Sequence, residues 1–336
     1  MKMKAIIRTK YGSPDVLQLK EVEKPIPKDN EVLVKVYAAS VNVDDLEHLR
    51  GTIAVRLIGP LKPKYKILGS DIAGRVEAVG RNIQQFQPGD DIFGDLTDYG
   101  FGAFAEYVCA PEDALVLKPV SMKFAEAATV TSRAAIAVKY LCAKRKIQQG
   151  QKVLINGAGG GVGTFAVQIA KYFGADVTGV DSTEKLDMLR SIGADHVIDY
   201  TKEDFTKNGQ IYDLILDVAA HHSIFDYKRA LSSKGIYLIV GGSRTAIFQA
   251  LFLGPLISMT GSKKMGIPMK PNKREDLVFV KELIESGKVV PVIDRSYSLS
   301  EIAKALRYLE EGKQRGKIVI TVEQNCNSNE HENGFL

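Results

Sequence analysis

The stretch NGAGGGVG at residues 156–163 decides the fold of this chain. It follows the short, mainly apolar run QKVLI (151–155) and leads into the helix-favouring sequence TFAVQIA (164–170). Glycines at such a junction permit a tight turn and a close backbone approach to a pyrophosphate, and the helix start supplies free N–H groups. The stretch predicts a strand, a dinucleotide-binding turn and a helix. A glycine-rich structural turn or hinge is the alternative.

Strands and helices alternate on both sides of this turn. We expect helices at 125–143, 161–173, 184–192, 224–231, 273–286 and 299–310, and strands at 152–156, 176–180, 196–199, 212–217, 235–240, 289–293 and 317–322. Such alternation is typical of a parallel sheet with crossover helices. Residues 124–289 are therefore interpreted as a doubly wound Rossmann domain.

The first 123 residues have a different character. Short apolar stretches, expected as strands at 4–8, 31–37 and 72–79, are separated by turn signals such as Gln87-Pro88-Gly89-Asp90. This pattern predicts a β-rich unit. We interpret this unit as the substrate domain, completed by residues from about 290 to 322. The polar last residues, 323–336, are expected to be a tail. The fold class is α/β with two domains, and a cleft between them is expected to hold the substrate.

Composition excludes several classes of function. The 336 residues are 45% hydrophobic and 25% charged, and a net charge of +5 is spread without a basic block. Nucleic acid is therefore not an expected partner. No apolar run approaches the ~18 residues of a membrane span, and no signal peptide is evident. Three scattered cysteines suit a reducing compartment, so a cytoplasmic location is expected.

The end of the second predicted Rossmann strand carries a candidate cofactor-binding residue. Asp181 stands where an acidic residue reads the ribose diol of NAD and repels the 2′-phosphate of NADP. It can also be an ordinary residue at a helix start, with Ser182 or Thr183 as the cap. Both readings remain open from the residues alone.

An ordered set of motifs resembles the medium-chain dehydrogenase/reductase superfamily. The set comprises LGSDIAGRV (68–76), QPGD (87–90), GAFAEYV (102–108), GGVG (160–163) and IGADHVIDY (192–200). Within the superfamily the chain looks most like the zinc-free quinone oxidoreductase branch, which includes zeta-crystallin and the reticulon-interacting mitochondrial protein group. The resemblance covers about residues 3–322, and it implies that the substrate domain is GroES-like.

The places of the zinc ligands argue against a metal. In zinc alcohol dehydrogenases a cysteine follows the third strand and a His-Glu pair follows a Leu-Gly, whereas this chain has Asn42 and Ser70-Asp71 there. An amide and a hydroxyl cannot replace a thiolate and an imidazole around zinc. The four-cysteine structural-zinc lobe is also missing, because no cysteine lies between Asp90 and Gly102. No metal site is predicted.

Without a Lewis acid, the economical chemistry is hydride transfer from a nicotinamide to a quinone or an α,β-unsaturated carbonyl. The resemblance places Asn42, of the turn Ser40-Val41-Asn42, beside the nicotinamide ribose and substrate, with Asp45 following as a second catalytic candidate. Taken alone, Asn42 is better interpreted as a turn residue with an Asx hydrogen bond, and only the resemblance reverses this preference.

The resemblance also implies a set of cofactor-binding residues. Lys185 and Tyr200 would flank the adenosine 2′ position, as in NADPH-dependent relatives, although Lys185 can also be an exposed surface lysine. Asp181 favours NAD, whereas Lys185 and Tyr200 favour NADP. On balance we expect NADP(H) as the cofactor and keep NAD(H) as an alternative. The full predicted set is Gly157, Gly159, Gly160, Gly161, Val162, Gly163, Asp181, Ser182, Lys185, Tyr200, Val218, Gly241, Gly242, Gly316 and Lys317.

The predicted function is thus a zinc-independent NAD(P)H-dependent oxidoreductase acting on a small-molecule quinone or enone. Two alternatives stay open: a zinc-independent alcohol or aldehyde dehydrogenase, and an NADPH-binding regulatory or assembly protein with little turnover. A homo-oligomer, dimer or tetramer, is expected because relatives commonly form one.

Overall fold

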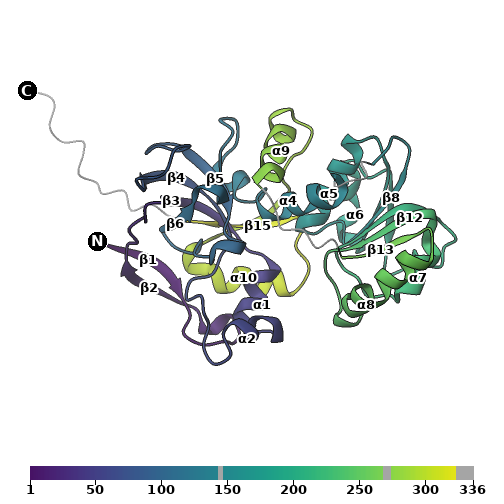
Figure 1. The fold of residues 1–336 in the computed structure, drawn as a ribbon, viewed down its shortest axis with the longest axis horizontal. Coiled ribbons are helices and arrows are strands. Elements are labelled where there is room, and N and C mark those ends of the chain that lie inside the picture. The colour runs from purple at the N-terminus through teal and green to yellow at the C-terminus, as the bar shows by residue number, and fades with distance from the viewer. Residues whose placement is uncertain (143–146, 268–273, 323–336) are drawn as a thin grey trace, which may run out of the picture. The chain divides into compact units, whose positions relative to one another are not determined.

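The computed structural model of the protein describes residues 1–142, 147–267 and 274–322, which form two compact units (Figure 1). The first unit comprises Met1–Leu117, Ser296–Glu310 and, of the described residues, 319–322. The second comprises Lys118–Arg295 and Glu311–Ile318. The chain thus leaves the first unit before the boundary expected at 123. The predicted tail, 323–336, lies outside the described residues.

The second unit is built on a six-stranded parallel sheet with the order β10-β9-β8-β11-β12-β13. Its strands are β8 (Lys152–Asn156), β9 (Asp176–Asp181), β10 (His196–Asp199), β11 (Tyr212–Asp217), β12 (Leu231–Ile239) and β13 (Lys264–Gly266). Its helices are α3 (Phe124–Ala127), α4 (Ser132–Cys142), α5 (Gly161–Tyr172), α6 (Leu186–Ser191), α7 (Ile224–Ala230), α8 (Arg244–Thr260) and α9 (Arg274–Glu285), with the short 3-10 helix η4 (Thr183–Lys185). The predicted doubly wound Rossmann sheet is confirmed.

Apolar strands explain this arrangement. Strands β8 and β11 read Val-Leu-Ile and Leu-Ile-Leu through their centres, and these side chains are buried. A parallel strand that is covered on both faces has this continuous apolar pattern. Helices α7 and α8 lie below β12 and β13 in Figure 1 and share a core with them.

The first unit is β-rich. A sheet with the path β14-β15-β3-β4-β5-β7 is joined by β6, which pairs with β3, and β1 and β2 form a separate antiparallel pair. Its strands are β1 (Lys2–Ile7), β2 (Gln18–Glu23), β3 (Glu31–Ser40), β4 (Asp71–Val79), β5 (Asp91–Asp95), β6 (Tyr107–Pro111), β7 (Leu115–Leu117), β14 (Ile293–Ser298) and β15 (Lys317–Thr321). Its helices are α1 (Val43–Arg50), α2 (Ile53–Ile58) and α10 (Ile302–Glu310), with 3-10 turns η1 (Pro14–Val16), η2 (Thr97–Tyr99), η3 (Glu112–Ala114) and η5 (Leu299–Glu301). Strands β14 and β15 span the division between the two units.

The expected strand at 289–293 is wrong, because strand β14 begins only at Ile293. The side chain of Gln168 forms two hydrogen bonds with the backbone of Val290. It accepts from the N–H at 2.8 Å and donates to the carbonyl at 2.9 Å. The next residue, Pro291, has no N–H to donate. These groups are therefore not available to a sheet ladder.

The expected helix at 125–143 is two helices, α3 and α4, and residue 143 lies outside the described residues. The side chain of Thr129 turns back to the carbonyl of Glu126 at 2.7 Å, where α3 ends. Among the described residues, no helix is both long and apolar enough to cross a membrane.

Candidate functional site

The glycine turn between β8 and α5 has little room for side chains on its protein side. Gly157 has φ of +77°, and the N–H groups of Gly157 and Ala158 donate to the carbonyl of Val180 at 3.0 and 3.1 Å. A Cβ at Gly163 would lie 2.3 Å from the carbonyl oxygen of Gly157. The turn therefore packs directly on the first turn of α5, as a dinucleotide-binding turn must.

Gly160 differs from these glycines because the protein does not crowd it. It is the N-cap of α5, and a Cβ built there would meet no neighbouring atom closer than 3.5 Å. The space beside Gly160 and the unpaired N–H groups of a 12-residue helix suit an anionic group. This fit supports a bound pyrophosphate. Of the other predicted residues here, Gly161 begins α5 and Val162 is buried within its first turn.

Asp181 ends β9 and reaches back to the glycine turn. Its Oδ2 accepts the N–H of Gly159 at 2.8 Å, and its Oδ1 accepts the N–H of Ser182 at 2.9 Å. Ser182 is the N-cap of the 3-10 turn η4 but makes no side-chain cap bond there. Asp181 therefore fixes the middle of the turn rather than capping a helix.

Lys185 is buried, and the reading of an exposed surface lysine is wrong. Its Nζ lies 3.3 Å from Oδ1 of Asp181 and donates to the carbonyl of Gly312 at 3.0 Å. Gly316 also contacts the glycine turn, since its N–H donates to the carbonyl of Gly159 at 2.8 Å. The segment 311–318 is thus bound to the glycine turn, and the side chain of the buried Lys317 lies beside Gly161.

The remaining predicted residues follow the other parallel strands at their carboxyl ends. Val218 follows β11 and donates its N–H to the carbonyl of Asn156 at 2.9 Å. Gly241 and Gly242 follow β12, and Gly241 accepts the N–H of Ala220 at 3.0 Å. Tyr200 follows β10, with its N–H 3.3 Å from the carbonyl of Asp181 and its ring half exposed. The carboxyl edge of a parallel sheet, at its switch point, is where ligands bind in this architecture.

A buried carboxylate lies at the same edge, and the sequence analysis missed it. Asp217 ends β11 opposite Asn156, whose Nδ2 donates to its Oδ1 at 2.8 Å, and the hydroxyl of Tyr237 donates to its Oδ2 at 3.1 Å. Burial raises the pKa of Asp217 to about 6, although these donors favour the ionised form. The sequence did contain a signal for this pair, because Asn156 and Asp217 are polar residues that end two apolar strands.

The first unit contains a second buried polar cluster, where β3, β4 and α1 meet. Asn42 precedes α1, and its Nδ2 donates to Oδ2 of Asp71 at 2.8 Å and to Oγ of Ser70 at 3.3 Å. Ser40, paired with Asp71 across β3 and β4, donates to the same Oδ2 at 2.7 Å. All four side chains are nearly or fully buried. Neutral donors thus surround the carboxylate of Asp71.

Asp45 supports this cluster through the backbone. Its Oδ2 accepts the N–H of Asn42 at 2.8 Å, and its Oδ1 accepts the N–H of Gly69 at 3.0 Å. Burial raises the pKa of Asp45 to about 7, against these two backbone donors. Since both oxygens are bound to the backbone, its contacts are those of a positioning residue.

Comparison with known proteins agrees with both units. Residues 28–120 match the alcohol dehydrogenase GroES-like domain family, and residues 192–320 match the zinc-binding dehydrogenase family. An Arabidopsis thaliana protein named NADPH-dependent alkenal/one oxidoreductase, chloroplastic, is 31% identical over 95% of this chain and 79% of its own length. Quinone-oxidoreductase QR1 of Triphysaria versicolor is 33% identical over 95% of this chain and 98% of its length. The chain belongs to the medium-chain dehydrogenase/reductase superfamily, in its quinone oxidoreductase branch. A solved quinone oxidoreductase from Coxiella burnetii superposes with a TM-score of 0.83, at 29% identity over 96% of this chain and all of the other.

The zinc in the name of the matched family does not fit the residues of this medium-chain reductase. Where its zinc relatives carry thiolate and imidazole, Asn42 and Ser70 lie within hydrogen-bond distance of one another and Asn42 donates to Asp71. A primary amide that donates a hydrogen bond is not a zinc ligand, and a serine hydroxyl is a poor one. In the described part of the chain, no group of three or more His, Cys, Asp or Glu side chains is arranged to hold a metal ion.

Proposed function

We propose that the chain is a zinc-independent NADPH-dependent reductase that transfers a hydride to a quinone or to the β-carbon of an α,β-unsaturated carbonyl. Relatives of about one-third identity over 95% of the chain carry the names of such enzymes. NADP(H) is the favoured cofactor and NAD(H) remains possible. When bound, the cofactor supplies the hydride, and the protein supplies binding, orientation and electrostatics.

One observation carries the choice of reaction: the place of the zinc ligands is filled by the hydrogen-bonded set of Asn42, Ser70 and Asp71. Without a Lewis acid, a reaction is favoured when hydrogen bonds alone can stabilise the developing charge, as they can when the acceptor already delocalises it. A quinone or a conjugated carbonyl meets this need, since charge is spread into an enolate or a quinol. Oxidation of a simple alcohol does not.

In the second unit, the glycine turn and the start of α5 would hold the pyrophosphate through backbone N–H groups and the helix dipole. Asp181, Lys185 and Tyr200 would read the adenosine ribose end, with Ser182 next to them. Val218, Gly241, Gly242, Gly316 and Lys317 would line the nicotinamide half.

In the first unit, Asn42 would orient the substrate or the nicotinamide ribose. Its amide is held by Asp71 and Ser70, so its direction is fixed before any ligand binds. Asp45 would act through the backbone of Asn42 and Gly69 as a positioning residue. Since Nδ2 already donates to Asp71 and Ser70, the amide oxygen of Asn42 is the atom that would meet the substrate or the ribose, as an acceptor. A polar group fixed in this way acts without reorganisation during the reaction.

The assembly and the location of the enzyme stay predictions. A dimer or tetramer is expected, and a cytoplasmic location is expected although the Arabidopsis relative is named chloroplastic.

The test is the loss of NADPH and NADH absorbance with a panel of quinones, enones, aldehydes and alcohols. Rapid turnover of quinones or enones with NADPH is the expected result. Turnover confined to alcohols and aldehydes would favour a zinc-independent alcohol or aldehyde dehydrogenase. Tight NADPH binding without turnover of any compound would favour the regulatory or assembly protein.

A further inference from the structure

The carboxylate of Asp199 lies at the adenosine end of the proposed cofactor site. Asp199 is the last residue of β10, and the register of the sheet places it opposite Asp181, the last residue of β9. Two neighbouring carboxylates repel each other unless each has its own donors. Those of Asp181 come from the glycine turn, Ser182 and Lys185, so Asp199 depends on a different set.

Asp199 takes its donors from both sides of the strand end. In the turn that follows β10, Thr201 donates its N–H to Oδ1 at 3.0 Å and its hydroxyl to the same oxygen at 2.7 Å. The Nζ of Lys202 lies 3.2 Å from Oδ2. Oδ2 also accepts the hydroxyl of Thr183, the first residue of η4. The hydroxyls of Thr183 and Thr201 hold the pKa of Asp199 well below its usual value, so the carboxylate stays ionised.

The bond from Thr183 links two segments that β10 and α6 separate in the chain. The 3-10 turn η4 contains Lys185, and the turn after β10 carries Tyr200. Lys185 is buried and is held by Asp181. Tyr200 has a half-exposed ring, and its backbone N–H lies 3.3 Å from the carbonyl of Asp181, which is a long contact. The place of Tyr200 therefore depends on the hydrogen bonds of Asp199.

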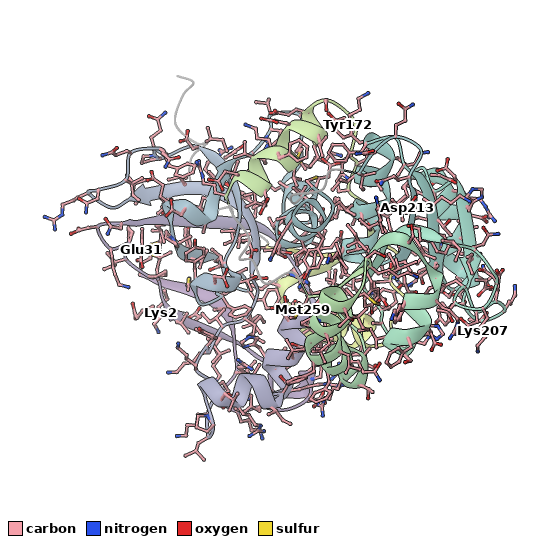
Figure 2. The ribbon with its side chains drawn as sticks, turned by 45° about the vertical axis from the view of Figure 1, so that its right-hand side comes forward. Lys2, Glu31, Tyr172, Lys207, Asp213 and Met259 are labelled. Atoms are coloured by element: carbon pink, nitrogen blue, oxygen red, sulfur yellow. The ribbon has the colours of Figure 1, made fainter. Side chains whose placement is uncertain are left out.

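The same four-residue pattern recurs five residues later and shows what distinguishes Asp199. Residues 199–202 read DYTK and residues 204–207 read DFTK. In the second copy, Oδ1 of Asp204 accepts the N–H and the hydroxyl of Thr206 at 2.9 and 2.7 Å, and Lys207 pairs with Oδ2 at 2.9 Å (Figure 2). Thr, Lys and Asp thus suffice to build the local turn. The bond to η4 is an addition made in the first copy.

We propose that Asp199 is a positioning residue for the adenosine 2′ end of the cofactor, an inference that rests on the proposed function. By binding η4 and the turn of Tyr200 at once, Asp199 fixes Tyr200 relative to the segment that carries Lys185. A preformed arrangement avoids the entropic cost of ordering Tyr200 when the 2′-phosphate binds. Asp199 does not touch the cofactor, and its effect on affinity is exerted through Tyr200.

The test compares 2′,5′-ADP with 5′-AMP, because these nucleotides differ only in the 2′-phosphate. Their dissociation constants are measured on the full chain by titration calorimetry, and the wild type should prefer 2′,5′-ADP. Asp199→Ala, and Thr183→Val, which removes only the linking hydroxyl, should each lower this preference at least about threefold. Asp204→Ala and Thr206→Val are the matched controls in the second copy of the pattern and should leave the preference unchanged.

A second arm separates positioning from a loss of stability. Thr183 is exposed, so Thr183→Val should keep the wild-type melting temperature, and it decides the question even where Asp199→Ala does not fold. In the Tyr200→Ala background, Thr183→Val should have no further effect on the preference, because the side chain that it positions is gone.

Three results overturn the inference alone: a preference retained in Thr183→Val, an equal loss in the two controls, or additive losses in the double variant with Tyr200→Ala. A wild type that binds both nucleotides equally overturns the inference together with the assignment of NADP(H). Nucleotide binding is measured without substrate, so the outcome does not depend on reductase turnover.

Discussion

The Nζ of Lys185 lies 3.3 Å from Oδ1 of Asp181, and both side chains are more than nine-tenths buried. The other carboxylate oxygen, Oδ2, holds the N–H of Gly159 in the glycine turn. The residue that favours NAD and the residue that favours NADP are therefore partners in one ion pair. In the proposed site, this cation would offset the repulsion that Asp181 alone would exert on a 2′-phosphate.

Lys185→Met should weaken NADPH binding about tenfold or more while changing NADH binding much less, because one charge-assisted contact to phosphate is lost. Asp181→Asn should act in the opposite direction and increase the preference for NADPH. Dissociation constants of both nucleotides, measured by titration calorimetry, give the ratio. Lys207→Met is the matched control, since Lys207, labelled in Figure 2, forms an exposed ion pair with Asp204. Equal loss of both nucleotides in Lys185→Met would contradict a role at the 2′ position.

Two glycines of the turn should respond differently to alanine. Gly163→Ala places a Cβ 2.3 Å from a backbone oxygen, so the turn must shift, and both stability and dinucleotide binding should fall. Gly160→Ala has no protein atom within 3.4 Å of the new Cβ, so the melting temperature should stay within about 2 °C of the wild type. Its methyl group would occupy space that we assign to the pyrophosphate, and NADPH binding should weaken. Unchanged NADPH affinity in Gly160→Ala would show that the ligand does not approach this position.

Asn42→Ala should lower kcat with a smaller effect on KM, because the lost amide orients reacting groups rather than anchoring the ligand. The variant also removes a donor from the buried carboxylate of Asp71, so the unfolding free energy should fall by about 1–3 kcal/mol. Asn82→Ala, an exposed position that donates to Asn30, is the matched control and should change neither quantity. A variant with wild-type kcat and reduced stability would make Asn42 purely structural.

The Rossmann part of the fold was predictable because the local sequence pattern of most of its strands and helices is enough to identify them. Strands β8, β10 and β11 have the predicted bounds, since each has an apolar centre and ends at a polar residue, Asn156, Asp199 and Asp217. Helix α8 was not predicted: it is apolar on almost all sides and contains Gly254 and Pro255, so it lacks a helical polar-apolar period. The strand predicted at 289–293 is wrong because of a contact that is distant in the sequence. The side chain of Gln168 hydrogen-bonds the N–H and the carbonyl of Val290.

The same distinction applies to the candidate site. The glycine turn and Asp181 could be named from spacing alone. The burial of Lys185 could not, because it depends on the carbonyl of Gly312, more than a hundred residues away in the chain. The cluster around Asp71 was visible only as a departure from zinc ligands, and its hydrogen bonds required the register that pairs Ser40 with Asp71.

Asp217 should make stability fall as pH rises. Burial raises its pKa from 3.8 to about 6, so between these values the folded state holds a proton that the unfolded state has released. The free energy of unfolding therefore decreases through this window, by up to about 3 kcal/mol from this group. Asp217→Asn removes the titration, so the variant should gain relative to the wild type as pH rises from about 4 to about 7. Urea unfolding at a series of pH values measures the difference.

Tyr237→Phe provides the second arm of this experiment. The hydroxyl of Tyr237 donates to Oδ2 of Asp217 and favours the ionised carboxylate, so its removal should raise the pKa further and move the loss of stability to higher pH. A difference between Asp217→Asn and wild type that does not depend on pH would refute the assignment to Asp217.

Activity should survive removal of metal. The cluster of Asn42, Ser70 and Asp71 offers zinc one carboxylate, and that carboxylate already accepts hydrogen bonds from Ser40 and Asn42. Enzyme treated with a strong chelator should keep its full rate and should contain less than about 0.1 zinc per chain by mass spectrometry. The positions themselves are close enough for a metal, since Nδ2 of Asn42 and Oγ of Ser70 are 3.3 Å apart. The N42C/S70H variant, which supplies thiolate and imidazole beside Asp71, should therefore acquire zinc, whereas the wild type should not. Loss of wild-type activity on chelation, restored by zinc, would mean that other ligands hold a metal and that the reaction depends on it.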